Sequence, residues 1–214
     1  MMTDTAIRPF DKILGEFISI IFHPLFIPGY ITAFLLYVHP FAFVGASAGF
    51  KILKLLQVVI STCFFPAFTV MLLKQLGFIS SIRLPTMRDR IIPIVASMVF
   101  YFWVFYVIRK QGDNPPELTQ MLCAVFVSSI IALTLNNFMK LSLHGIAMGI
   151  LVTFFTIMAW QSLIPMGMPL ALALLIAGLT GTARLMVQAH TVKELLIGFS
   201  TGILSMLIGY VAAV

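Results

Sequence analysis

Long stretches without a charged side chain constrain this chain more than any other feature of its sequence. Residues 17–50 contain no Asp, Glu, Lys or Arg, and neither do residues 145–183. Charged residues make up 9% of the chain, against roughly 25% in soluble domains, and the mean hydropathy is +1.09. A soluble core of this size would need a polar surface that these residues cannot supply. The composition excludes a soluble globular enzyme, a disordered chain and a disulfide scaffold, and indicates a polytopic membrane protein.

The uncharged runs predict an all-α transmembrane bundle of six or seven helices, because a span needs about 20 mostly apolar residues. The candidate spans are residues 14–38, 53–78, 91–108, 119–138, 145–163, 168–184 and 194–213. Pro24 and Pro28 fall inside the first, and proline removes a helical hydrogen bond. That segment is either a kinked span or lies partly in the interface. With no repeat or flexible linker, residues 1–214 are expected to form a single integral-membrane domain.

The few charges cluster at the ends of the predicted spans. Residues 118–214 hold only four charges: Lys140, Arg184, Lys193 and Glu194. An earlier cluster follows the second span and contains Arg83, Arg88, Asp89 and Arg90. Ionisable groups at membrane depth are costly and usually functional. Because two crossings separate each neighbouring pair, the segments 83–90, 142–144 and 184–194 are expected at one membrane surface.

The residue types in these three segments suit phosphoryl transfer without a metal. Arginine offers forked donors for phosphate oxygens, and two histidines can divide the roles of nucleophile and general acid. His190 and Glu194 are four residues apart at the start of the last predicted helix. Glu194 can therefore accept from one ring nitrogen and leave the other free to attack phosphorus. Ser142 precedes the 145–163 helix and can cap it, where free N–H groups favour an anion.

The three segments resemble, in order, the motifs of the type 2 phosphatidic acid phosphatase superfamily, integral-membrane lipid phosphatases related to the vanadium haloperoxidases. The family motifs are Lys-x6-Arg-Pro, Pro-Ser-Gly-His and Ser-Arg-x5-His-x3-Asp. The corresponding segments here run from Arg83 to Ile91, from Leu141 to His144, and from Ala183 through Arg184 and His190 to Glu194. The third is the most specific. The chain departs from the motifs at these positions: Arg83, Ile91, Leu141, Leu143, Ala183 and Glu194.

The resemblance implies a role for each site residue. His190 would form a phosphohistidine, Glu194 would orient it, and His144 would protonate the leaving oxygen. The phosphate oxygens would be held by Arg83, Arg90, Ser142 and Arg184. It also implies a lipid phosphate or diphosphate as substrate and no metal or other cofactor. Membrane lipids are the other expected partners, and no nucleic acid is expected.

Each assignment has a simpler alternative. The cluster around His190 could be an interfacial salt bridge. Arg83 and Arg90 could be ordinary residues at a span end, whose long side chains place their charge in the polar interface. The motif departures also leave open an inactive phosphatase-like protein that binds or transports a phospholipid. His23 and His39 stand beside prolines, away from the motifs in the sequence, and are expected to be structural.

The orientation of the site is weakly determined by the basic residues. In a seven-span arrangement nine lie on the motif side and four on the other, which favours a cytoplasmic site. Three of the nine, Arg83, Arg90 and Arg184, have a functional reason to be there, and without them the ratio is six to four. The family that the chain resembles usually works on the outer face of the bacterial plasma membrane, and we expect that orientation.

Overall fold

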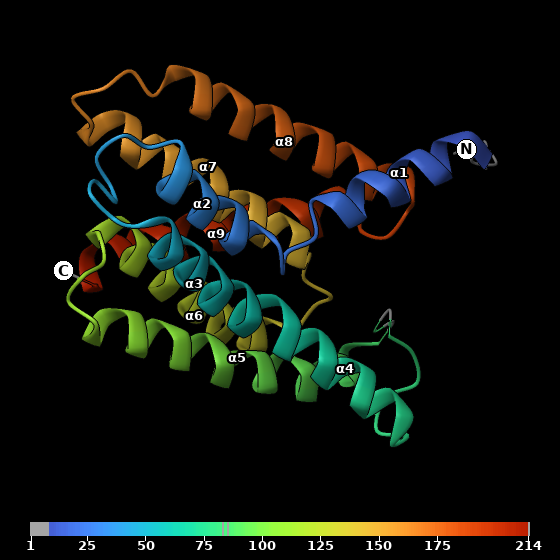
Figure 1. The fold of residues 1–214 in the computed structure, drawn as a ribbon. Coiled ribbons are helices and arrows are strands. Elements are labelled where there is room, and N and C mark those ends of the chain that lie inside the picture. The colour runs from blue at the N-terminus through green and yellow to red at the C-terminus, as the bar shows by residue number, and fades with distance from the viewer. Residues whose placement is uncertain (1–8, 83, 85, 214) are drawn as a thin grey trace.

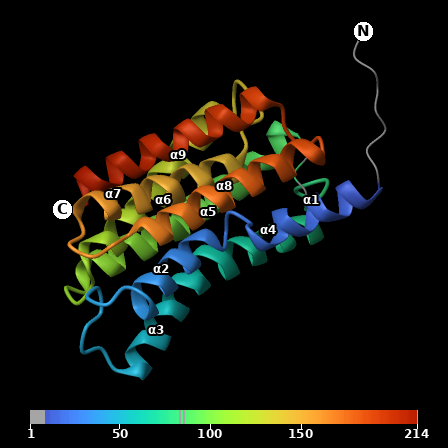
Figure 2. The ribbon, with the colours of Figure 1, turned by 90° about the horizontal axis from the view of Figure 1, so that it is seen from above.

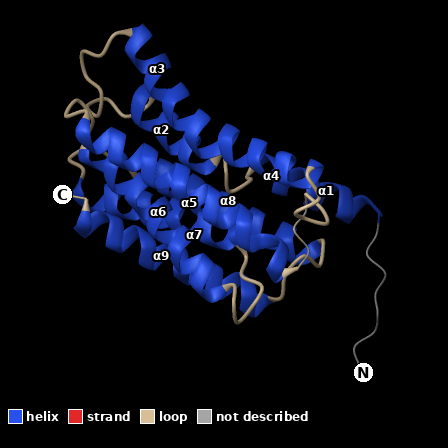
Figure 3. Ribbon diagram, turned by 90° about the horizontal axis from the view of Figure 1, so that it is seen from below, coloured by secondary structure: helices blue, strands red, loops and turns tan. Residues whose placement is uncertain are grey.

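Helices account for most of the chain that the computed structural model describes, residues 9–82, 84 and 86–213, and no strand occurs in these ranges (Figures 1 and 3). The α-helices are α1 (Pro9–Ile21), α2 (Ile27–Tyr37), α3 (Ala48–Val59), α4 (Phe65–Gln75), α5 (Met87–Lys110), α6 (Pro116–Leu135), α7 (Leu143–Gln161), α8 (Gly167–Met186) and α9 (Val192–Ala212). A π-helical turn, Ile60–Phe64, joins α3 and α4 into one rod. The expected all-α fold is confirmed.

Six helices within the described ranges are long and apolar enough to cross a membrane. They are the α3–α4 rod (Ala48–Gln75), α5, α6, α7, α8 and α9. Each corresponds to one of the spans predicted from 53–78 onward, with ends that differ by at most five residues. Some helices extend past the uncharged runs because long basic side chains can carry their charge to the interface. The architecture is that of an integral, multi-pass membrane protein.

The first predicted span is broken into two short helices. As described, α1 has 13 residues and α2 has 11, fewer than the about 20 that a span needs. Pro28 lies in the first turn of α2, where proline is tolerated, and His23 Nδ1 accepts the N–H of Leu25 at the break (3.4 Å). Figures 1 and 2 show α1 near the N-terminal end of the bundle and α2 continuing toward the opposite end. The segment is therefore broken between Ile21 and Ile27, where Pro24 lies.

A seam of glycines brings the first turns of α7 and α9 together. A Cβ added at Gly149 would overlap the carbonyl oxygen of Phe199, and one at Gly202 would overlap that of Ile146. One turn earlier, a Cβ at Gly198 would lie 2.6 Å from the carbonyl oxygen of the residue before α7. The two backbones are thus in direct contact, as small residues spaced four apart allow in membrane helices. Because successive turns of α7 meet successive turns of α9, the two helices run parallel.

Three helices begin at the same end of the bundle, which we call the site end (Figure 1). They are α5, α7 and α9, and each has a side-chain cap. Thr86 accepts the N–H of Asp89, Ser142 that of Gly145, and Thr191 that of Glu194. Helix N-termini carry partial positive charge, so their shared location favours an anion there.

Candidate active site

His190 and Glu194 form a hydrogen-bonded pair at the site end. His190 lies in the turn between α8 and α9 with its side chain 4% exposed, and its Nδ1 is 3.1 Å from Glu194 Oε2. The same carboxylate oxygen accepts the backbone N–H of Thr191 (3.0 Å), which completes a capping box. Nδ1 is therefore engaged by the carboxylate, and Nε2 is the ring nitrogen left for other chemistry.

Burial keeps the His190 imidazole neutral. Desolvation lowers the pKa of His190 to about 4, and the charges of Arg90 and Arg184 act in the same direction. The hydrogen bond and charge of Glu194 oppose this shift. At neutral pH the ring therefore retains the lone pair that a nucleophile needs.

Arg90 lies in the first turns of α5 and ties that helix to the start of α7. Its Nε donates to the carbonyl oxygen of Leu84 (3.1 Å), and Nη1 donates to that of Leu141 (2.9 Å). The side chain is buried, and its charge interacts with Glu194 and Arg184. A guanidinium has five N–H groups, so these two bonds leave donors for a ligand.

Arg184 lies in the last turn of α8 and contributes a buried donor to the same cluster. Its Nε has no hydrogen-bond partner among the described residues. Its charge acts on both His144 and His190. A buried N–H without a partner costs free energy, so a bound anion would stabilise this arrangement.

Ser142 and His144 stand at the start of α7. Ser142 is fully buried, and its Oγ accepts the N–H of Gly145 (3.2 Å), which is the cap expected from the sequence. His144 is also buried, with Nε2 3.0 Å from the carbonyl oxygen of Ser19 in α1. A carbonyl can only accept, so this Nε2 carries a proton and donates it to Ser19. Proton donation by Nε2 to a leaving group requires exchange of that bond.

Six of the seven predicted site residues therefore lie at the site end, and Arg83 lies outside the described residues. An open pocket of about 390 Å³ reaches the His190 pair from the surface. It is lined by Lys140, Leu185, Gln188, Ala189, His190, Thr191 and Glu194. Lys140 also donates to the carbonyl oxygen of Ala189 (3.4 Å), which ties the segment before α7 to the turn that carries His190.

Backbone strain occurs at the same place. Among the described residues, Leu84 (φ 49°) and Gln188 (φ 50°) are the non-glycine residues with left-handed φ. This conformation costs roughly 1–2 kcal/mol per residue, and such strain concentrates at functional sites. The carbonyl of Leu84 accepts from Arg90, and Gln188 lies two residues before His190. Leu84 thus supports Arg90 directly, whereas Gln188 ends α8 in a Schellman motif, in which Ala189 N–H donates to the Arg184 carbonyl oxygen (3.1 Å).

The N-terminal segment supplies two contacts that sequence reasoning missed. The Ser19 carbonyl binds His144, and the His23 ring centroid lies 5.4 Å from that of His144 at an interplanar angle of 82°. His23 is far from the motifs in the sequence, but it lies against one of them in the fold. No local pattern indicates this contact, because it depends on how α1 and α2 pack. The glycine seam, in contrast, could have been found from the four-residue spacing of Gly145 and Gly149.

Within the described ranges, no three His, Cys, Asp or Glu side chains come together in a way that could hold a metal ion. No protein-family model, curated protein or solved structure matches the chain.

Proposed function

We propose that the protein is a membrane-embedded phosphatase that hydrolyses a lipid phosphate or diphosphate monoester through a phosphohistidine. The observation that carries this proposal is the His190–Glu194 pair. A buried, neutral imidazole has one nitrogen held by a carboxylate, while the charges of Arg90 and Arg184 act on it. A nucleophile oriented by a third group and surrounded by anion-binding donors suits attack on phosphorus.

In the proposed reaction His190 Nε2 attacks phosphorus, and the bond from phosphorus to the leaving oxygen breaks. The leaving oxygen takes a proton from the His144 imidazolium, which becomes a neutral ring. Water then attacks the phosphohistidine, the bond between phosphorus and His190 Nε2 breaks, and the proton that the water loses returns to His144. Inorganic phosphate is released and the His190 ring is again neutral. Arg90, Arg184 and the helix N-termini would stabilise the charge on the phosphoryl oxygens. The resemblance assigns Arg83 and Ser142 to the same task, without a metal.

The position of the site suits a lipid substrate. The site end would place a phosphorylated head group at the interface while the tail remains among the apolar helices. An apolar groove of about 410 Å³ runs between α1 and α8, and Ala183 lines it next to Arg184. We further propose that the site faces the outer side of a bacterial plasma membrane, as the resemblance implies.

The proposal is tested by phosphate release from reconstituted protein in the presence of a chelator. The substrates are an isoprenyl diphosphate, phosphatidate, phosphatidylglycerophosphate and a lipid A phosphate. We expect release from at least one, and a decrease of about 100-fold or more, on the order seen for lost acid–base groups, in His190→Ala and His144→Ala. His39→Ala is the control, because His39 follows α2 at the end of the bundle opposite the site end. Release by both site variants at the parent rate would contradict the mechanism.

A second candidate is phospholipid binding or transport without turnover. The contact between His144 Nε2 and the Ser19 carbonyl favours it, because the proposed acid already has a partner. This candidate predicts that the protein binds inorganic phosphate but that no phosphohistidine is trapped on His190. Steady phosphate release would exclude it.

A further inference from the structure

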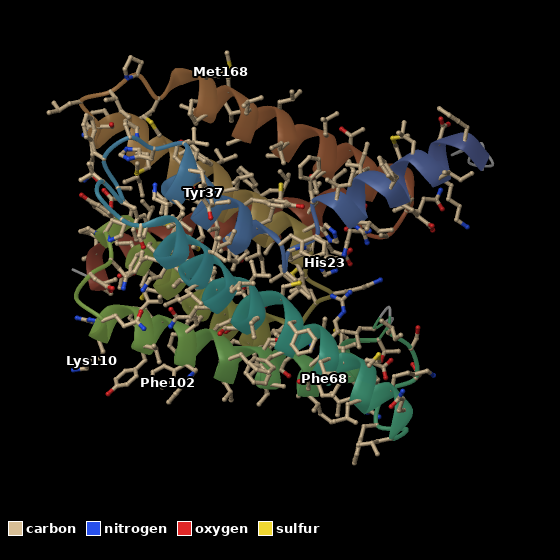
Figure 4. The ribbon with its side chains drawn as sticks, viewed as in Figure 1. His23, Tyr37, Phe68, Phe102, Lys110 and Met168 are labelled. Carbon is tan, nitrogen blue, oxygen red and sulfur yellow. The ribbon has the colours of Figure 1, made fainter. Side chains whose placement is uncertain are left out.

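We propose that His23 is an additional phosphate-binding residue of this site, an inference that rests on the proposed function. His23 lies at the break between α1 and α2, where Figure 4 shows it on the side of the bundle's site end. The N-terminal segment would then supply part of the substrate site and not only a support for the other helices.

One ring contact and one electrostatic interaction place His23 in the cluster. Its ring packs edge-on against His144, with 5.4 Å between ring centroids. The charge of Arg184 acts on His23 and on His144 alike. His23 is thus close to two residues that the proposed reaction uses, although about 120 residues separate it from His144 in the sequence.

The local backbone fixes which nitrogen of His23 can donate. Nδ1 accepts the N–H of Leu25 (3.4 Å), so this nitrogen carries the lone pair in the neutral ring. The proton is then on Nε2, which has no hydrogen-bond partner within the part of the chain that the structure describes. A neutral N–H donor can lie near Arg184 without the repulsion of a second cation, and it can bind a phosphate oxygen beside that arginine.

The chain offers a matched control at the far end of the bundle. His39 also precedes a proline, and its Nδ1 also accepts a backbone N–H, from Ala42 (3.0 Å). Replacement of either histidine removes a side chain that accepts a nearby backbone N–H. Of these two histidines, only His23 contacts His144. A loss of stability alone would therefore affect both variants.

The experiment measures the Kd for inorganic phosphate and the KM for the lipid substrate in full-length, reconstituted protein. We expect His23→Ala and His23→Asn to raise both about tenfold, the effect of one lost charge-assisted hydrogen bond. His23→Gln should remain near the parent, because its amide N–H extends about as far as Nε2. His39→Ala should leave both values unchanged.

Three outcomes decide the matter. If the parent releases phosphate and His23→Ala keeps the Kd and KM of the parent, the inference about His23 is wrong while the proposed function stands. If His23→Gln is as weak as His23→Ala, the ring and not the donor matters, which also overturns the inference. If the parent neither binds nor releases phosphate, the proposed function and the inference both fail.

Discussion

At the scale of single residues, Glu194 has two partners whose contributions can be separated. Its carboxylate accepts from Thr191 in the capping box of α9 and contacts His190 Nδ1. The first contact stabilises a helix end, and the second orients the proposed nucleophile. A purely structural glutamate would need only the first.

We predict that Glu194→Gln lowers kcat by about tenfold or more, which corresponds to a rise of about 1.4 kcal/mol in the activation free energy. Thermal stability should change little. The amide oxygen still accepts from Thr191, but the negative charge that supports the His190 ring is lost. Glu194→Ala should lose both contacts and additionally lower thermal stability, because the capping box of α9 loses its N3 side chain while Thr191 remains. Steady-state kinetics and thermal unfolding measure the two effects. Equal kcat for Glu194→Gln and the parent would leave Glu194 with a capping role alone.

How far the site could be predicted differs from residue to residue. The spacing of His190 and Glu194 predicts their contact, but the contact forms around the capping box and not along a helix face, because His190 lies one residue before the N-cap Thr191. Ser142 was predictable as a cap from its place before an apolar run. Two features could not be predicted, because both depend on packing between helices distant in sequence. They are the contact of His23 with His144 and the Arg184 Nε that finds no partner among the described residues.

At the scale of elements, the glycine seam sets the spacing between the helices that follow Ser142 and His190. We predict that Gly149→Leu lowers both thermal stability and phosphate release, because its side chain would meet the backbone of Phe199 and force α7 and α9 apart. Gly49→Leu is the control, since a Cβ at Gly49 meets nothing within 4 Å. Thermal unfolding and phosphate release of both variants check this. Parent-like behaviour of Gly149→Leu would show that the seam is not required.

The spans were predicted well where long uncharged runs end at charges, because the bilayer thickness fixes their length. The exact ends were not, since basic side chains let a helix continue into the interface. At residues 22–26 Pro24 and the hydrogen bond from the Leu25 N–H to His23 Nδ1 interrupt the helix, and hydropathy alone cannot tell this break from a continuous span.

At the scale of the whole molecule, the proposed outer-face site makes a prediction about labelling. Lys193 lies at the site end and Lys110 at the opposite end, and both are exposed. In a background of Cys63→Ala and Cys123→Ala, the Lys193→Cys variant should react with an impermeant maleimide on intact cells. The Lys110→Cys variant should react only after lysis. The reverse pattern would place the site in the cytoplasm, as the count of basic residues favours.

The glycine seam also limits how the protein could recover from mutation. Gly149 and Gly202 face each other across α7 and α9, and no amino acid is smaller than glycine. A clash introduced at one position therefore cannot be relieved by a smaller residue at the other. Second-site suppressors of Gly149→Ala should arise instead where α9 can shift as a body, for example in the turn before Val192 or beside Gly209, whose neighbour is α6.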